Sequence, residues 1–179
     1  MWDPETKARP FMQLPDHSPL EPEWESLVQA VAAMITLAPE YVVLQTYTPH
    51  DRSSGPYVQT LQEADGAMTL EAVSNRFLEV PLGPSQMRQL ADMGWEAPGE
   101  EPGLPNYTRF LESEEVEPGS VARFLVLTLR DVYGVTVHDQ FECAPQDLFV
   151  QVLNGDFGFD TGMRHVAFDI DDWKRRNGR

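Results

Sequence analysis

The sequence predicts an α+β fold in which an antiparallel β-meander is covered by helices. Three consecutive stretches between residues 41 and 75 have the composition and alternation of strands, namely YVVLQTYT, PYVQTLQEA and AMTLEAVS. Helix-type apolar spacing comes before them and returns after them. We therefore expect the order helix, three strands, helix, short strand, helix, followed by a C-terminal β extension.

Length and composition favour one domain that needs no covalent or metal support. The chain has 179 residues, enough to bury a sizeable core. Its single cysteine, Cys143, has no partner for an intrachain disulfide, so we expect a reducing, cytoplasmic setting. No apolar run approaches the roughly 20 residues of a membrane helix. The N-terminal stretch is acidic and proline-rich, unlike a secretory signal.

The charge balance limits the classes of partner. Thirteen Lys and Arg stand against 29 Asp and Glu, a formal net charge of −16. A field of this sign repels nucleic acid and anionic membranes, so we expect neither as a partner. It attracts a basic protein, although the same charge is also explained by solubility alone.

We divide the chain into three parts. Residues 1–17 form an N-terminal arm in which prolines prevent regular helix. Residues 18–143 form the α+β domain. Residues 144–179 are expected to add strands and a basic tail packed on the same domain, with four of the 13 basic residues between 174 and 179.

The first helix is the clearest local prediction. Its apolar residues recur three and four positions apart, which places them on one buried face. They are Trp24, Leu27, Val28, Val31, Met34, Ile35 and Ala38. Pro39 ends the helix. Its start is open between a capping box at Ser18–Glu21 and a start at Pro22.

Alternation within the meander assigns side chains to faces. Strand one is apolar on both faces, which suggests a central or doubly covered position. Strands two and three each keep a polar face, which makes that side of the sheet a candidate binding surface. In strand one, Val42, Leu44 and Thr46 share one face, and Tyr41, Val43, Gln45 and Tyr47 share the other. In strand two, Tyr57, Gln59 and Leu61 share one face. In strand three, Met68, Leu70 and Ala72 share one face, with Thr69 and Glu71 opposite. Asp65-Gly66 predicts a type I′ hairpin turn.

The second half of the chain is less regular. Residues 84–93 predict a helix with Met87, Leu90 and Ala91 inward and Gly94 as its stop, after which Trp95 is expected to pack back onto the sheet. Residues 107–111 alternate like a short edge strand. Residues 120–134 alternate like a buried strand, but their length, with Ser120 as N-cap and Gly134 as stop, favours a helix. VTVHDQF, DLFVQVL and RHVAFDI are strand-like.

Motifs for catalysis or metal binding are weak. His50-Asp51 and His138-Asp139 are neighbours in sequence, and on a strand such neighbours point to opposite faces. Residues 154–160 resemble a calcium loop, but His165 stands where the bidentate Glu is needed. We predict a turn there, no cofactor, no metal and no enzymatic activity.

The order and spacing of several segments resemble the TY-Chap family. These bacterial, largely actinobacterial domains are grouped with type III secretion chaperones and YbjN-type proteins. The resemblance covers residues 22–143 and rests on Tyr57-Val58-Gln59, Glu71-Ala72-Val73-Ser74-Asn75, Leu90-Ala91 with Gly94-Trp95, and Leu129-Arg130-Asp131-Val132-Tyr133-Gly134-Val135. It implies a type III secretion chaperone-like or YbjN-like fold, a peptide or protein client, and a homodimer.

The leading hypothesis is a non-catalytic cytoplasmic chaperone-like protein that binds a client on an open sheet face or edge. The proposed contacts are Tyr57, Gln59, Leu61, Glu71, Asn75 and Trp95, although ordinary core packing also explains Tyr57, Leu61 and Trp95. One alternative is an immunity-type protein that neutralises a basic toxin. Another is a metal-dependent hydrolase that uses His138, Asp139 or residues 154–160.

Overall fold

The computed structural model describes residues 19–38, 40–47, 54–99, 104–136, 140–156 and 158. From α1 to α3 the helices and strands follow one another in the predicted order, and the α+β fold is confirmed. The elements are α1 (Pro22–Leu37), β1 (Tyr41–Tyr47), β2 (Ser54–Gln62), β3 (Met68–Ala72), α2 (Pro84–Met93), β4 (Tyr107–Leu111), the short 3₁₀ helix η1 (Ser113–Glu115), α3 (Pro118–Leu127), the π-helical turn η2 (Thr128–Val132), β5 (Gln140–Ala144) and α4 (Gln146–Asn154).

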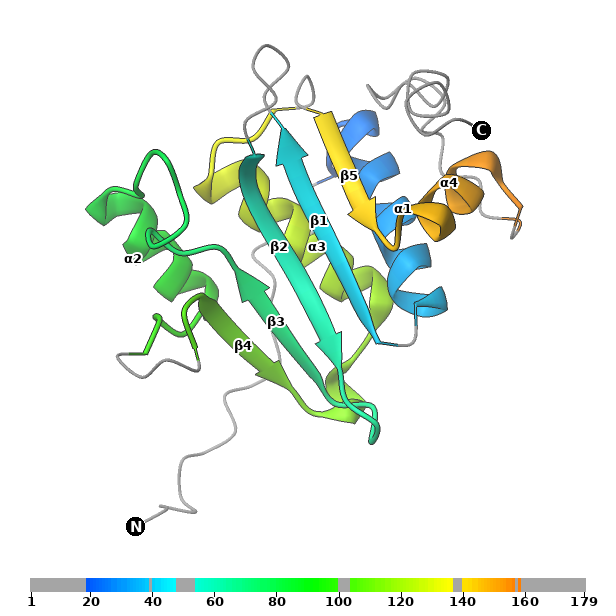
Figure 1. Cartoon of the computed structure of the whole chain (residues 1–179), viewed down its shortest axis with the longest axis horizontal. Coiled ribbons are helices and arrows are strands. Elements are labelled where there is room, and N and C mark those ends of the chain that lie inside the picture. The colour runs from blue at the N-terminus through cyan, green and yellow to red at the C-terminus, as the bar shows by residue number, and fades with distance from the viewer. Residues whose placement is uncertain are drawn as a thin grey trace.

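The sheet is antiparallel throughout, with the strand order β4-β3-β2-β1-β5 (Figure 1). The meander from β1 to β3 and the edge position of β4 are confirmed. β5 pairs with the side of β1 that β2 leaves free, placing Cys143 opposite Leu44. β1 therefore lies inside the sheet, as its apolar pattern on both faces predicted.

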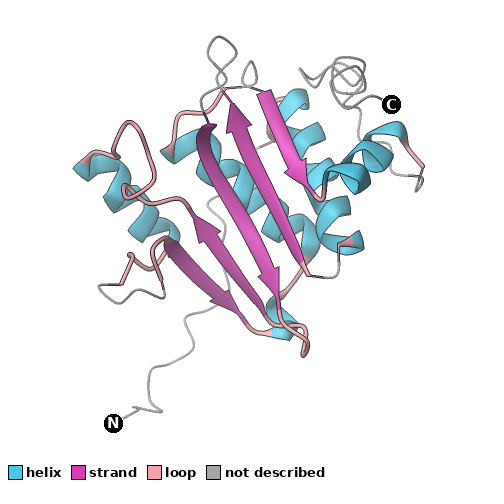
Figure 2. Ribbon diagram, viewed as in Figure 1, coloured by secondary structure: helices cyan, strands magenta, loops and turns pink. Residues whose placement is uncertain are grey.

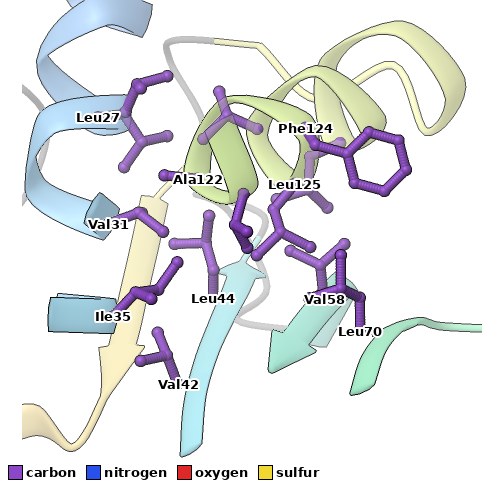
Figure 3. Close-up of a cluster of buried hydrophobic side chains, with 14 of the residues drawn as sticks. Leu27, Val31, Ile35, Val42, Leu44, Val58, Leu70, Ala122, Phe124 and Leu125 are labelled. Carbon is purple, nitrogen blue, oxygen red and sulfur yellow. The ribbon is translucent and has the colours of Figure 1, made fainter. Parts of the chain in front are cut away.

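Helices α1 and α3 cover one face of the sheet and pack against each other (Figure 2). All the residues of the predicted apolar stripe of α1 are buried. Leu27, Val31 and Ile35 point from α1 toward the buried side chains of the strands, while Ala122 and Leu125 approach them from α3 (Figure 3). Interlocking of these side chains excludes water and supplies the main stabilising term of the fold.

The starts of two helices follow from local chemistry. α1 begins at Pro22, so the later of the two predicted starts is correct. Helix was also the correct choice for α3, but it begins at Pro118 rather than after Ser120. The Glu117 carboxylate accepts hydrogen bonds from the Gly119 and Ser120 backbone N–H groups at 3.0 and 2.6 Å and thus caps the helix.

Three local predictions are wrong. The segment DLFVQVL is not a strand but lies in α4, which packs against α1 and β5. In α2 only Leu90 is buried, whereas Met87 and Ala91 are exposed. The hairpin between β2 and β3 has a three-residue loop rather than a two-residue type I′ turn. Glu63 N–H donates to the Ala67 carbonyl at 2.8 Å, while Gly66 N–H donates to the Glu63 carbonyl at 3.0 Å and Gly66 has φ +91°.

Two other strand predictions are tested only in part. Within VTVHDQF, the structure places residues 135 and 136 outside any strand and begins β5 at Gln140, while residues 137–139 lie outside the described part of the chain. The segment RHVAFDI lies wholly outside the described residues.

Candidate functional site

The sheet face away from α1 and α3 is the candidate site, and we call it the open face. In Figure 2 the strands lie in front of both helices, with this face toward the viewer. Strand alternation and register assign its residues. They are Tyr41, Val43, Gln45 and Tyr47 of β1, Tyr57, Gln59 and Leu61 of β2, Thr69 and Glu71 of β3, Thr108 and Phe110 of β4, and Glu142 and Ala144 of β5.

One row across the open face is rich in exposed apolar surface. Tyr41, Leu61, Thr69 and Phe110 stand opposite one another on four neighbouring strands, and we call them the apolar row. Tyr41 is 43% exposed, Leu61 48% and Phe110 56%. Single exposed apolar side chains are common on protein surfaces, but three in one row form a patch that a partner could cover.

The next row is organised around the carboxylate of Glu71. Oε2 of Glu71 accepts hydrogen bonds from Gln59 Nε2 at 3.0 Å and from Asn106 Nδ2 at 2.8 Å. Asn106 Nδ2 also donates to the Tyr57 hydroxyl at 3.1 Å, and its Oδ1 accepts from the Ser74 backbone N–H at 3.3 Å. Since Asn106 is buried, these bonds hold the carboxylate in one orientation.

Both bonds to Glu71 use the same oxygen. Its other oxygen, Oε1, has lone pairs that these contacts leave unused. Glu71 is only partly buried, so a group that approaches the open face can reach it. The row therefore presents an oriented hydrogen-bond acceptor with a negative charge.

A second carboxylate lies on the β1–β5 side of the open face. Glu142 stands opposite Gln45 and accepts a hydrogen bond from Gln146 Nε2 at 3.2 Å. Burial and the negative charge of Glu142, together with a hydrogen bond between the two side chains, raise the pKa of Tyr47. Gln45 donates instead to the Gly55 and Thr46 carbonyls, at 2.7 and 3.0 Å, so its amide is occupied locally.

Four of the six residues proposed from the sequence come together here. Tyr57, Gln59 and Glu71 are linked through hydrogen bonds, and Leu61 lies in the neighbouring apolar row. Tyr57 and Gln59 are partly buried on the open face, and Leu61 is exposed. None of the four belongs to the buried core.

The other two residues lie elsewhere. Asn75 closes the loop after β3, because its Oδ1 accepts from the Leu82 N–H at 2.6 Å and its Nδ2 donates to the Leu82 carbonyl at 3.1 Å. Trp95 is 4% exposed, donates from Nε1 to Thr128 Oγ1 at 3.2 Å and stacks on Phe124 of α3 with ring centroids 5.0 Å apart. It belongs to the core, not to the open face.

Sequence reasoning missed Asn106, Phe110 and Tyr41. Phe110 carried a usable signal, because it alternates with Arg109 and Leu111 in a predicted edge strand. Asn106 carried none: it precedes β4, and its contacts with Tyr57 and Glu71 join positions far apart in the sequence.

Metal and acid–base chemistry finds little support in the described part of the chain. No group of three His, Cys, Asp or Glu there could hold a metal ion. His138 and Asp139 lie outside the described residues, and of residues 154–160 only 154–156 and 158 are described. Asn154 ends α4 and Gly155 caps it with φ +79°, so the first residues of the supposed calcium loop terminate a helix.

The described residues of the chain contain no helix long and apolar enough to cross a membrane.

Comparison with protein families agrees with the architecture. Residues 17–143 match the model of TY-Chap3, described as T3SS (YopN, CesT) and YbjN peptide-binding chaperone 3. The chain belongs to the TY-Chap3 family. The match ends within β5, one residue before its last, so it takes in all five strands but not α4. Comparisons with curated proteins and with solved structures found no match. Membership in TY-Chap3 suggests a peptide-binding, chaperone-like role.

Proposed function

We propose that this TY-Chap3 protein is a non-catalytic cytoplasmic chaperone that binds a segment of a client polypeptide on its open face. The observation that carries the proposal is the apolar row. Three large apolar side chains remain between 43% and 56% exposed on a sheet whose other face packs against helices. Covering such a row with a partner removes apolar surface from water and is favourable.

The face is a better candidate than the edge at β4. There the backbone of Thr108 already exchanges hydrogen bonds with the backbone of Glu96, at 2.8 and 3.0 Å, so the edge is partly used by the chain itself. An added strand would compete with these bonds. On the open face, Leu61 and Phe110 would instead gain contacts without losing any hydrogen bond.

Site-specific photo-crosslinking tests the proposal. A photoreactive phenylalanine analogue replaces Leu61 in one protein and Val80 in a control. Val80 is 81% exposed but lies in the loop between β3 and α2, not on a strand of the sheet. We expect a discrete crosslinked client from position 61 and not from position 80. Its segment should then bind the purified protein, with affinity lost in the double variant Leu61→Ser, Phe110→Ser.

Equal crosslinking from both positions, or unchanged binding of the purified client segment to the double variant, would refute the proposal. Both substituted side chains are exposed, so loss of binding with an unchanged melting temperature reports on the surface and not on folding. The homodimer stays a prediction, which light scattering tests. We place its interface outside the open face.

A further inference from the structure

We propose that the open face selects a basic–apolar segment, in which a large apolar side chain is flanked at two residues' distance by Lys or Arg. This inference rests on the proposed function and specifies the chemistry of its client. Its basis is the arrangement of charge around the apolar row.

Negative charge lies on both sides of the apolar row. On one side, two residues further along the strands, is the oriented carboxylate of Glu71. On the other side, just beyond the ends of β2 and β4, Glu63 and Glu112 follow Leu61 and Phe110 by two positions, the spacing that keeps one face of a strand. These two residues are exposed, and we call them the acidic rim.

Positive charge is absent from the described residues of this face. Its two acidic residues are Glu71 and Glu142. The described arginines belong to other parts of the molecule. Arg109 packs on Phe124 of α3, Arg123 and Arg130 form ion pairs with Glu25 and Glu21 of the α1 region, Arg76 lies in the loop after β3, and Arg88 is in α2. The field over the open face is therefore negative and selects a cationic partner.

The spacing of these features matches an extended polypeptide. Neighbouring rows on one face of a sheet are two residues apart along each strand, which is about 7 Å. Side chains i and i+2 of an extended segment lying along the strands have the same separation. An apolar side chain on Leu61 and Phe110 would thus place one cation near Glu71 and another near the acidic rim.

The same charge argues against a second copy of the chain as the occupant. In a twofold-symmetric dimer the same patch faces itself, so two open faces would bring their carboxylates together. Opposed like charges disfavour that contact. A polypeptide of opposite charge has no such penalty.

Peptide binding measured by fluorescence anisotropy tests the inference. The probe is a labelled seven-residue peptide with leucine at its centre, lysine two residues to each side and threonine elsewhere. Matched peptides carry glutamate in place of both lysines, or alanine in place of leucine. We expect the lysine peptide to bind at least about tenfold more tightly than the glutamate peptide, and less tightly at high salt.

Variants of the full chain locate the effect. Glu71→Gln keeps an oxygen to accept from Gln59 and Asn106 but removes the charge, and should weaken the lysine peptide about threefold to fivefold. Its matched control, Glu23→Gln, is exposed on α1 and should change nothing. Phe110→Ser should weaken the lysine peptide about tenfold or more by removing apolar contact.

The outcomes separate the two proposals. If lysine and glutamate peptides bind alike while Phe110→Ser weakens both, the charge selection is wrong and face binding survives. If the double variant Leu61→Ser, Phe110→Ser binds every peptide as the wild type does, the proposed function fails. If no peptide binds at about 1 mM, a millimolar dissociation constant is excluded and the inference is overturned.

Two further results would assign the face to a different occupant and overturn the inference. One is a dimer in light scattering that Phe110→Ser converts to a monomer, which would identify a second copy. The other is tighter peptide binding when Lys174, Arg175, Arg176 and Arg179 are all replaced by Gln in the full chain, which would identify the chain's own basic tail. We expect neither.

Discussion

The two faces of the sheet are formed by the same strands but differ in their exposure to solvent. On the covered face, Leu44, Val58 and Leu70 are no more than 1% exposed, enclosed by α1 and α3. On the open face, Leu61 and Phe110 are about half exposed. Apolar residues of the covered face therefore hold the fold together, whereas those of the open face contribute little to it and are available to a partner.

The largest expected effect is on the covered face. Leu70→Ala removes a side chain that is fully enclosed, and should lower the free energy of unfolding by about 2–5 kcal/mol through lost burial and the cavity left behind. Urea denaturation measures it. A decrease below about 1 kcal/mol would mean that the helix layer does not pack tightly on β3.

Asn106→Ala tests the hydrogen bonds that orient Glu71 on the open face. The substitution leaves the Ser74 N–H without its partner and removes two hydrogen bonds on the open face, so the free energy of unfolding should fall by about 1–3 kcal/mol. It should also weaken the lysine peptide, because Glu71 loses its orientation. Asn75→Ala is the control: it releases a loop but leaves Glu71 untouched, and should spare peptide affinity.

Tyr133→Phe tests a hydrogen bond between the helix layer and the end of β3. The Tyr133 hydroxyl donates to the Val73 carbonyl at 2.6 Å, and its loss should cost about 1 kcal/mol at neutral pH. Burial, with smaller contributions from Tyr107 and Tyr57, raises the pKa of Tyr133.

The sign of the pH dependence follows from that shift. At pH values below about 10, the pKa of tyrosine in the unfolded chain, the stabilisation that comes from the raised pKa of Tyr133 is fully present. Above it the unfolded chain loses the proton while the folded one keeps it, so the free energy of unfolding falls as pH rises. The Phe variant should show a shallower fall than the wild type above pH 10. Parallel curves would contradict the assignment.

The smallest effect is expected on the open face. Leu61→Ala should change the free energy of unfolding by no more than about 0.5 kcal/mol, in contrast to Leu70→Ala. Peptide affinity should show the reverse order. Leu61→Ala should bind the lysine peptide more weakly, whereas Leu70→Ala should keep its affinity under conditions in which that variant is folded. A destabilisation as large as that of Leu70→Ala would mean that the open face is covered within the monomer.

Errors of the sequence interpretation have identifiable causes. The segment DLFVQVL is strand-like, yet its Leu148, Phe149, Val152 and Leu153 also fit one helix face. Packing against α1 and β5 decided between the two. The cap residue Gly155 was the available local signal.

The candidate site divides in the same way. Alternation correctly placed Tyr57, Gln59, Leu61 and Glu71 on a partly solvated face, because that period is a local property of each strand. The structure instead places Trp95 in the core and Asn75 in the loop after β3, because proximity in sequence to the end of a strand or helix does not tell which layer a side chain enters.

The amino-acid pattern alone determined which residues form the meander, where α1 and α2 lie, and which side of β2 and β3 faces water, since each depends on periodicity and caps within a few residues. Only tertiary structure decided that β5 pairs with β1, that Asn106 orients Glu71, and that Phe110 extends the row begun by Tyr41 and Leu61. These contacts join residues separated by dozens of positions. Their free energy comes from burial and hydrogen bonding that exist only once the sheet has assembled.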